Sequence, residues 1–233
     1  MLRGIFNPCD LASSTWLFLY VLNRIALYAI DSCIRVVVSS APIISPTTRR
    51  LPASRYDVTF LSVNSIVEYT FTLHIFKMMR CLDTPLSVVW TPLRWYALVW
   101  CDDVMYTVLH RVLHWPGVYG LIHAHHHRIT RPSLGYVDAG NEHPVEQMAA
   151  LMIHIASIRA VRLLIDIDAV VVFTHVMVKT AAACLNHSNR DVVLHLGLGV
   201  EINPRYHHEH HIRRRCNYTQ LIPSLDRTPA TRH

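Results

Sequence analysis

Histidine is the residue type whose spacing in this chain most clearly points to chemistry. Most of the 17 histidines fall into three tight groups, at residues 110–114, 123–127 and 207–211, and single histidines stand at 143 and 187. Neutral imidazole is a strong ligand for borderline transition metals such as iron and zinc. A tetrahedral zinc takes only four ligands. So many imidazoles therefore predict two metal ions that share one pocket.

The spacing within each group predicts which rings act together. Residues three or four apart lie on one face of a helix, and each group contains such a set. By the same geometry His125 lies about 200° around the helix from His123, and His208 about 100° from His207, so both are predicted bystanders. The predicted ligands are His110, His114, His123, His126, His127, His187, His207, His210 and His211. His143 is a secondary candidate, because the following Pro144 is also typical of a helix start.

The remaining histidines are isolated, and an isolated histidine is usually an ordinary core or surface residue. We apply that interpretation to His74, His154, His175 and His233, whereas His195 is left open. For the three groups the ordinary interpretation is weak, because buried imidazoles without partners are costly.

The composition favours a membrane-associated chain or a very large core. Apolar residues make up 52% and charged residues 16%, against roughly 25% charged in an average soluble protein. The formal net charge of +6 suits contact with anionic lipid headgroups. The basic residues are scattered and accompany no nucleic-acid motif, so no nucleic-acid partner is expected. The cysteines form no CxxC pair and are interpreted as reduced thiols. No cleavable signal peptide is evident.

Several apolar stretches could position these histidines. Leu11–Ile30 has about the length of one bilayer crossing, and two to four crossings are expected in all. Residues 1–90 are predicted to form an N-terminal membrane-anchoring region and residues 91–233 the catalytic domain. The other predicted segments are apolar stretches at Val58–Met79 and Leu86–Trp100, a linker at Ser39–Pro52, a helix at Asp102–Trp115, and a helical hairpin made of Met148–Ile165 and Ile167–Leu185.

The histidine groups and their neighbours occur in a recognisable order. The elements are Asp102-Asp103 before His110-Arg111-x-x-His114, then His123-x-x-His126-His127 with Pro132, His143-Pro144-x-Glu146, His187-Ser188, and His207-x-x-His210-His211 with Asn217-Tyr218 and Asp226-Arg227. Over residues 95–228 this order resembles the sterol desaturase / fatty acid hydroxylase superfamily of membrane-bound di-iron enzymes. The chain departs from the usual pattern at Ala124, Thr219 and Leu225, and none of these departures removes a predicted ligand.

This resemblance implies an all-α fold: an integral membrane helical bundle with a cytosolic-facing, histidine-rich helical cap that holds the dimetal site. It implies two iron ions that use O2 to attack a C–H bond of a membrane lipid. Electrons would come from a cytochrome b5-type donor and an NAD(P)H reductase at the cytosolic face of the endoplasmic reticulum, since the chain has no GxGxxG fingerprint.

Carboxylates near the boxes are candidates for supporting roles. Histidine ligands usually donate their second N–H to such a partner. Asp103, two helical turns before His110, is the first candidate and Glu146 the second, and both are assigned catalytic roles; Glu209 is another candidate. Solvent-facing charge or helix capping is the equal alternative for each. Arg111 is expected to pair with a carboxylate of the box or with a lipid headgroup.

The substrate and reaction are predicted at several levels. The Asn217-Tyr218-x-Gln220 run resembles sterol C-5 desaturases and C-4 methyl oxidases, so a sterol is the first choice. A fatty acyl or sphingolipid hydroxylase of the same superfamily is the alternative. A metal-binding membrane protein without turnover is the hypothesis from another class. A soluble zinc hydrolase is poorer, because it needs three ligands and an open position. Hydroxylation and desaturation share the first hydrogen abstraction, so the sequence predicts both reactions equally. It predicts no oligomeric state.

Overall fold

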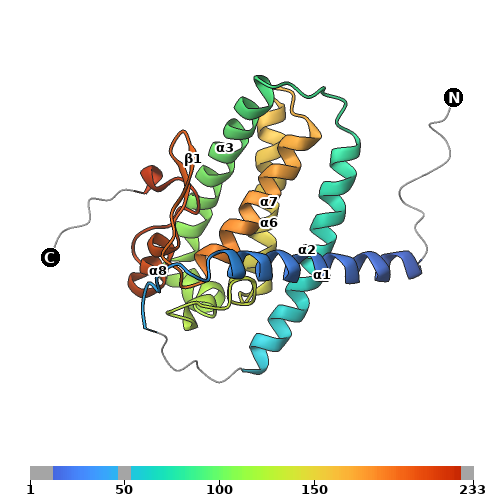
Figure 1. The fold of residues 1–233 in the computed structure, drawn as a ribbon. Coiled ribbons are helices and arrows are strands. Elements are labelled where there is room, and N and C mark those ends of the chain that lie inside the picture. Colours follow the sequence, from blue (N-terminus) through green and yellow to red (C-terminus); the bar gives the residue numbers. More distant parts are fainter. Residues whose placement is uncertain (1–12, 47–53, 227–233) are drawn as a thin grey trace.

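The structure, a computed structural model, describes residues 13–46 and 54–226. Over these residues the chain is mostly helical, which confirms the predicted helical fold (Figure 1). The long helices are α1 (Ser13–Val37), α2 (Arg55–Arg80), α3 (Trp90–Leu113), α6 (Pro144–Arg162) and α7 (Ala169–Asn186).

Four of the long helices form one bundle. Helix α3 packs against α6 and α7, and α2 packs against α6. Figure 1 shows these four side by side, with α1 running across them. Their shared core contains one or more buried apolar side chains from each helix, including Ile75, Leu98, Ile158 and Val171. The bundle is thus the rigid frame on which the histidine-bearing segments are mounted.

Helix α3 differs from the prediction, which placed Leu86–Trp100 and Asp102–Trp115 in separate segments. The structure has one continuous helix from Trp90 to Leu113. Pro92 lies in its first turn, where the missing N–H has no partner to lose. Because the helix is unbroken, the bundle core and His110 belong to one continuous element, with His110 in its last turn.

The predicted helical hairpin is confirmed as α6 and α7. Helix α6 begins at Pro144, earlier than predicted, with His143 as the N-cap residue whose ring accepts from the Val145 N–H. Asp168 caps α7 by accepting from the Val171 N–H at 3.0 Å. The hairpin holds Glu146 and His187 at the same end of the bundle, because one begins α6 and the other follows α7.

Short elements connect and flank the long helices. They are α4 (Pro116–Val118), the π-helical turn η1 (Tyr119–His123), the 3-10 turn η2 (His126–Arg128), α5 (Tyr136–Ala139), the strands β1 (Leu194–Gly197) and β2 (Val200–Ile202), α8 (Pro204–Arg213) and the 3-10 turn η3 (Pro223–Leu225). The strands pair antiparallel, with Leu194 opposite Ile202. This hairpin was not predicted, and it sets the start of α8 against a second core that contains Val99 and Leu221.

Among the described residues, two helices are long and apolar enough to cross a bilayer: Leu17–Val37 within α1, and α7. Large apolar side chains on α1 are exposed, including Leu17 and Phe18. The first residues of the predicted span Leu11–Ile30 lie outside the described residues. The last residues of the predicted linker Ser39–Pro52 also lie outside them. The division at residue 90 stays a prediction.

Candidate metal centre

Nine histidines gather at one end of the bundle in two groups. Within each group the candidate ligand atoms lie within 4.8 Å of one another. The first group, called the five-histidine group below, is His110, His114, His123, His127 and His210. The second, the four-histidine group, is His126, His187, His207 and His211. The structure therefore brings together the nine primary candidates as two adjacent sites, and the secondary candidate lies elsewhere.

The division of the second and third boxes differs from the one-face prediction. His126 belongs to a different group from its neighbours His123 and His127. The cause is local, because a π-helical turn ends at His123 and a 3-10 turn begins at His126. These turns change the angle per residue, so the second box reaches both groups. On α8, His210 likewise separates from His207 and His211.

Backbone carbonyls fix the orientation of several rings. The Nδ1 atom lies 2.7 Å from the Tyr218 carbonyl in His110, and 2.7 Å from the Cys216 carbonyl in His210. In His187 it lies 2.8 Å from the Ala183 carbonyl. A carbonyl oxygen only accepts, so each Nδ1 carries the proton and each Nε2 keeps its lone pair. The Nε2 atom is then available as a ligand in each of these rings.

These Nε2 atoms face one another at short range. His114 Nε2 lies 3.2 Å from His210 Nε2 and 3.0 Å from His123 Nε2. In the four-histidine group, His207 Nε2 lies 3.2 Å from His187 Nε2 and 3.1 Å from His211 Nε2. Converging lone pairs repel unless a cation lies among them. Both groups therefore fit a bound metal ion, and nitrogen donors suit iron or zinc.

Burial keeps these rings neutral. It lowers the pKa of His110 to about 4 and that of His114 to about 3, with the neighbouring imidazole adding to the effect on His114. It also holds the pKa of His123 well below the usual value of histidine. Neutral imidazole is the form that binds a metal, so the site is in its binding state at neutral pH.

Of the two predicted carboxylates, Glu146 contacts a candidate ligand. His123 Nδ1 donates to Glu146 Oε1 at 2.5 Å, and both side chains are buried. Burial, with the neighbouring Glu142 adding to the effect, raises the pKa of Glu146 well above its usual value. The contact therefore orients the ring through an accepting carboxyl oxygen. Glu142, which had not been predicted, lies half-buried beside Glu146, and desolvation raises its pKa to about 8. Its place just before a helix start gave no spacing signal.

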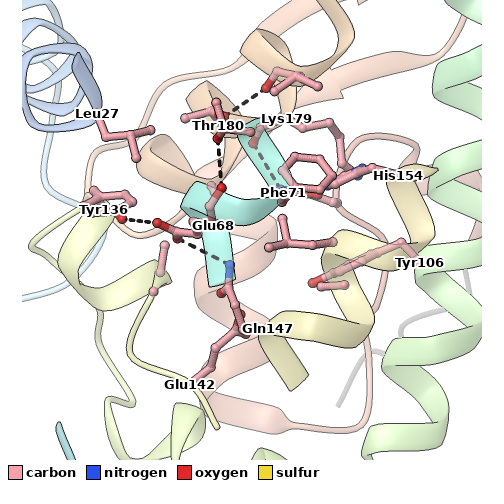
Figure 2. Close-up of a pocket in the computed structure, with 18 of the residues that line it drawn as sticks. Leu27, Glu68, Phe71, Tyr106, Tyr136, Glu142, Gln147, His154, Lys179 and Thr180 are labelled. Atoms are coloured by element: carbon pink, nitrogen blue, oxygen red, sulfur yellow. Dashed lines mark hydrogen bonds between the residues drawn. The ribbon is translucent and has the colours of Figure 1, made fainter. Parts of the chain in front are cut away.

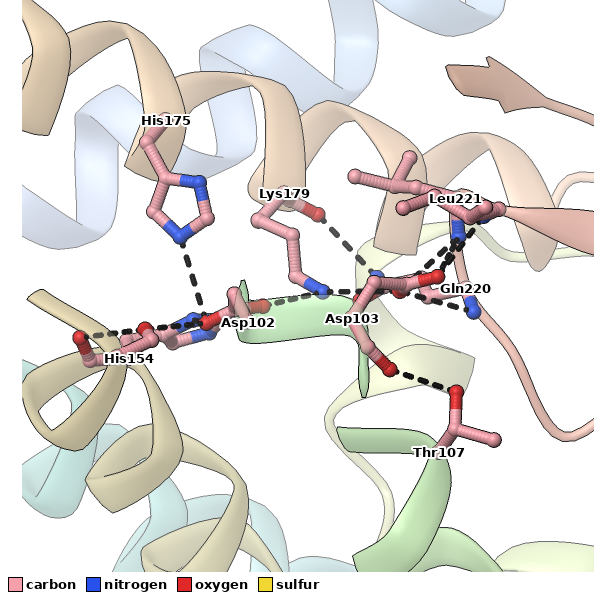
Figure 3. Close-up of polar contacts among 10 residues, drawn as sticks. Asp102, Asp103, Thr107, His154, His175, Lys179, Gln220 and Leu221 are labelled. Atoms are coloured by element: carbon pink, nitrogen blue, oxygen red, sulfur yellow. Dashed lines mark hydrogen bonds and ion pairs between the residues drawn. The ribbon is translucent and has the colours of Figure 1, made fainter. Parts of the chain in front are cut away.

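Asp103 does not contact the histidines, contrary to the prediction. Its carboxylate accepts from the backbone N–H groups of Gln220, Leu221 and Ile222, the last at 2.8 Å (Figure 3). Asp103 precedes His110 by two helical turns, about 10 Å along α3, so its carboxylate is too far away to reach the ring. Asp103 instead fixes the C-terminal segment, in which the Tyr218 carbonyl orients His110.

The structure places His143 outside both groups. Its Nδ1 caps α6, and its ring packs on Phe60 with the ring centres 5.0 Å apart. His143 therefore acts as the start of a helix, which was the alternative prediction for this residue. Glu209 is also turned away from the histidines and pairs with Arg213.

The predicted bystanders do lie outside the two groups. His125 Nε2 contacts Asn141 at 2.9 Å, and His208 Nε2 contacts the Ser45 hydroxyl at 2.9 Å. Arg111 pairs with Asp226 at 2.5 Å, which is the carboxylate alternative of its prediction.

A cavity of about 440 Å³ extends from the histidines into the bundle. Figure 2 shows part of its lining, including Glu68, Phe71 and Tyr106. At one end its wall contains members of both groups, namely His123 and His126, with His187 and His207. Further along it is lined mainly by apolar side chains of α2, α6 and α7, such as Phe71, Ile75 and Val176. An apolar chamber thus ends beside two candidate metal sites.

The comparison with known families agrees with this site. The family described as fatty acid hydroxylase matches residues 95–231, more than half of the chain. The chain belongs to the fatty acid hydroxylase family. The resemblance to the sterol desaturase / fatty acid hydroxylase superfamily is thereby confirmed, and this family member is a membrane oxidoreductase that acts on lipids. No curated protein and no solved structure matches the chain.

Proposed function

We propose that the protein is an O2-dependent di-iron oxidase that hydroxylates or desaturates a sterol in the endoplasmic reticulum membrane. One observation carries this proposal. The apolar cavity ends beside both histidine groups, so a lipid in the cavity would present a C–H bond to both metal positions. A protein that only stored or moved metal would not need a lipid-sized chamber at that place.

The nine imidazoles would hold two iron ions, one in each group, and these ions when bound supply the O2 chemistry that no side chain can perform on an unactivated C–H bond. The chain's own residues supply the setting. Glu146 orients the His123 ring. The apolar wall accepts the lipid skeleton and excludes water from the reacting end.

The finer parts of the proposal rest on sequence. The Asn217-Tyr218-x-Gln220 run favours a sterol, as in C-5 desaturases and C-4 methyl oxidases, over a fatty acyl or sphingoid substrate. Gln220 lines the cavity, so this run lies at the lipid chamber. We place the site at the cytosolic face, where a cytochrome b5-type donor and an NAD(P)H reductase would supply electrons.

Metal content and O2 use test this function together. The protein is expressed with iron available, purified in detergent, and compared with a His110/His126/His210→Ala variant, which loses ligands from both groups. A His74→Ala/His195→Ala variant is the matched control, because both rings are exposed. Close to two irons per chain, with O2 consumption that depends on reduction and is lost only in the triple variant, is the expected result. Tightly held zinc under iron-replete expression, with no O2 use, would contradict it.

A further inference from the structure

Tyr106 of α3 is a tyrosine in the wall of the cavity that the metal chemistry described above does not use. Its side chain lines the cavity, and it points from α3 toward the other lining residues (Figure 2). Within the described part of the chain its hydroxyl makes no hydrogen bond, yet neighbouring atoms do not seal it off. The hydroxyl is therefore a polar group that faces open space inside the protein.

Several other polar side chains of the cavity wall already have partners within the protein. Tyr136 and Gln147 both donate to the carboxylate of Glu68 (Figure 2). The Thr180 hydroxyl donates to a backbone carbonyl of its own helix at 2.9 Å. A polar group that a lipid covers without a hydrogen bond costs free energy. The cavity therefore favours a lipid that offers an oxygen atom to Tyr106.

Two contacts fix the direction of the Tyr106 ring. Its centre lies 5.3 Å from the ring centre of His110. The Lys179 ammonium lies over the ring, 5.0 Å from its centre, and a cation in this position is attracted by the aromatic face. The hydroxyl is thus held in place before a ligand binds, which lowers the entropic cost of a hydrogen bond to that ligand.

The Tyr106 hydroxyl lies near the metal end of the cavity. Tyr106 precedes His110 by one turn of α3, about 6 Å along the same face of the helix. Burial raises the pKa of Tyr106 well above its usual value, and Glu142 and Glu146 add to the effect. Charges act most strongly at short range, and Glu146 is the residue that contacts His123. An oxygen bound to Tyr106 would therefore hold the carbons next to it near the metal positions.

We infer that the Tyr106 hydroxyl donates a hydrogen bond to the C-3 oxygen of the sterol in the cavity. The inference rests on the proposed function and adds a residue that selects the substrate. A phenol is protonated at neutral pH, and it can donate to a hydroxyl or to a carbonyl oxygen. The C-4 methyl groups and C-5 of a sterol are close neighbours of its C-3 oxygen, so this contact would present them to the metals. The apolar remainder would extend along the wall that contains Phe71, Ile75 and Val176.

Competition binding with three sterols tests the inference. Metal-loaded protein in nanodiscs is incubated with tritiated cholesterol, which is displaced by cholestanol, by cholestan-3-one or by cholestane, which has no oxygen. The variant Tyr106→Phe removes the hydroxyl and keeps the ring between His110 and Lys179. The variant Tyr28→Phe is the matched control, because its side chain is exposed and does not line the cavity.

We expect the wild type and Tyr28→Phe to bind cholestanol and cholestan-3-one about three- to tenfold more tightly than cholestane, as for one net hydrogen bond. Tyr106→Phe should lose this preference and keep the wild-type metal content. Equal displacement by all three sterols in the wild type, or an unchanged preference in Tyr106→Phe, would overturn the inference. A wild-type preference for cholestanol alone would also overturn it, because the phenol would then accept rather than donate.

The remaining outcomes separate this inference from the proposed function. Loss of metal in Tyr106→Phe would overturn the inference, because the hydroxyl would then support the metal sites. Because binding needs no turnover, a preserved preference without O2 consumption would contradict the proposed function alone. Turnover without any preference would contradict this inference alone, and the absence of saturable cholesterol binding would contradict both.

Discussion

In several histidines of the two groups, a backbone carbonyl binds the ring nitrogen Nδ1, which leaves Nε2 free to bind metal. His211 Nδ1 lies 2.9 Å from the Ile129 carbonyl, as the corresponding atoms of His110 and His210 lie near other carbonyls. Each contact commits one nitrogen to the fold and leaves the other for the metal. Partners of this kind typically change metal affinity by about 10- to 100-fold when they are removed. The metal affinity of the site thus depends on backbone atoms that a sequence motif cannot show.

Two adjacent histidines of the second box should behave in opposite ways. His126 lies in the four-histidine group, with its Nε2 3.4 Å from that of His187. His125 lies outside and contacts Asp57 at 3.1 Å. We expect His126→Ala to lose about one metal per chain, and His125→Ala to keep both. Metal analysis of the two purified variants checks this, and an equal loss from both would contradict the assignment of the groups.

At the scale of elements, the long helices could be predicted from the apolar stretches in the sequence, whereas the turns could not. The hairpin of α6 and α7 was predicted because its two helices are apolar stretches of helical length. The division of α3 was wrong, because the apolar stretch to Trp100 and the histidine-bearing segment from Asp102 were treated as separate, whereas one helix runs through both. The π-helical turn that ends at His123 had no sequence signal, so the ligand set was predicted and its division into five and four was not. The buried contacts of Asp102 with His154, His175 and Lys179 were missed because these residues come from three separate helices.

Gly135 is the position where a turn depends most on its residue type. Its φ is +56°, and an added Cβ would lie 2.1 Å from Asp31 Oδ1. Its N–H donates to the carbonyl of His187 at 2.9 Å, which links the turn to the four-histidine group. The strain of such a backbone is on the order of 1–3 kcal/mol, before the clash with Asp31 is added.

We therefore expect Gly135→Ala to lower the free energy of unfolding by at least about 1–3 kcal/mol and to weaken metal binding. Gly117→Ala is the matched control, because no atom lies within 4 Å of its added Cβ. Thermal unfolding and metal content of the two variants provide the measurement. A Gly135→Ala protein with wild-type midpoint and metal content would show that the turn can relax without cost.

At the scale of the whole molecule, the bundle joins the metal positions to an apolar cavity. The metal positions lie at one end and the apolar lining follows, and Lys179, which pairs with the buried Asp102, lies in the wall further along. Helices α3, α6 and α7 each contribute to both polar regions, or end beside them. The position of the cavity relative to the metal sites is therefore set by the core of the bundle rather than by loops. A rigid spacing of this kind is what positional selectivity on a lipid requires.

The many buried neutral imidazoles also make the metal-free molecule sensitive to acid. An unfolded histidine titrates near pH 6.5, whereas burial lowers the pKa of His110 to about 4 and that of His114 to about 3. Below pH 6.5 the unfolded chain then binds more protons than the folded chain, so stability falls as the pH falls. The stabilising contribution is fully present above about pH 6.5 and is lost progressively toward pH 4.

We expect the unfolding midpoint of chelator-treated protein to drop steeply between pH 7 and pH 5. Metal-loaded protein should resist until protons displace the metal, because only neutral imidazole binds it. Differential scanning fluorimetry across this range, with metal analysis of each sample, measures both effects. The control is His195→Gln, which removes an exposed ring and should leave the slope unchanged, since its side chain is 76% exposed. A midpoint that does not change with pH in the metal-free protein would mean that the buried rings find partners for their protons, and the neutral ligand state argued for the site would be wrong.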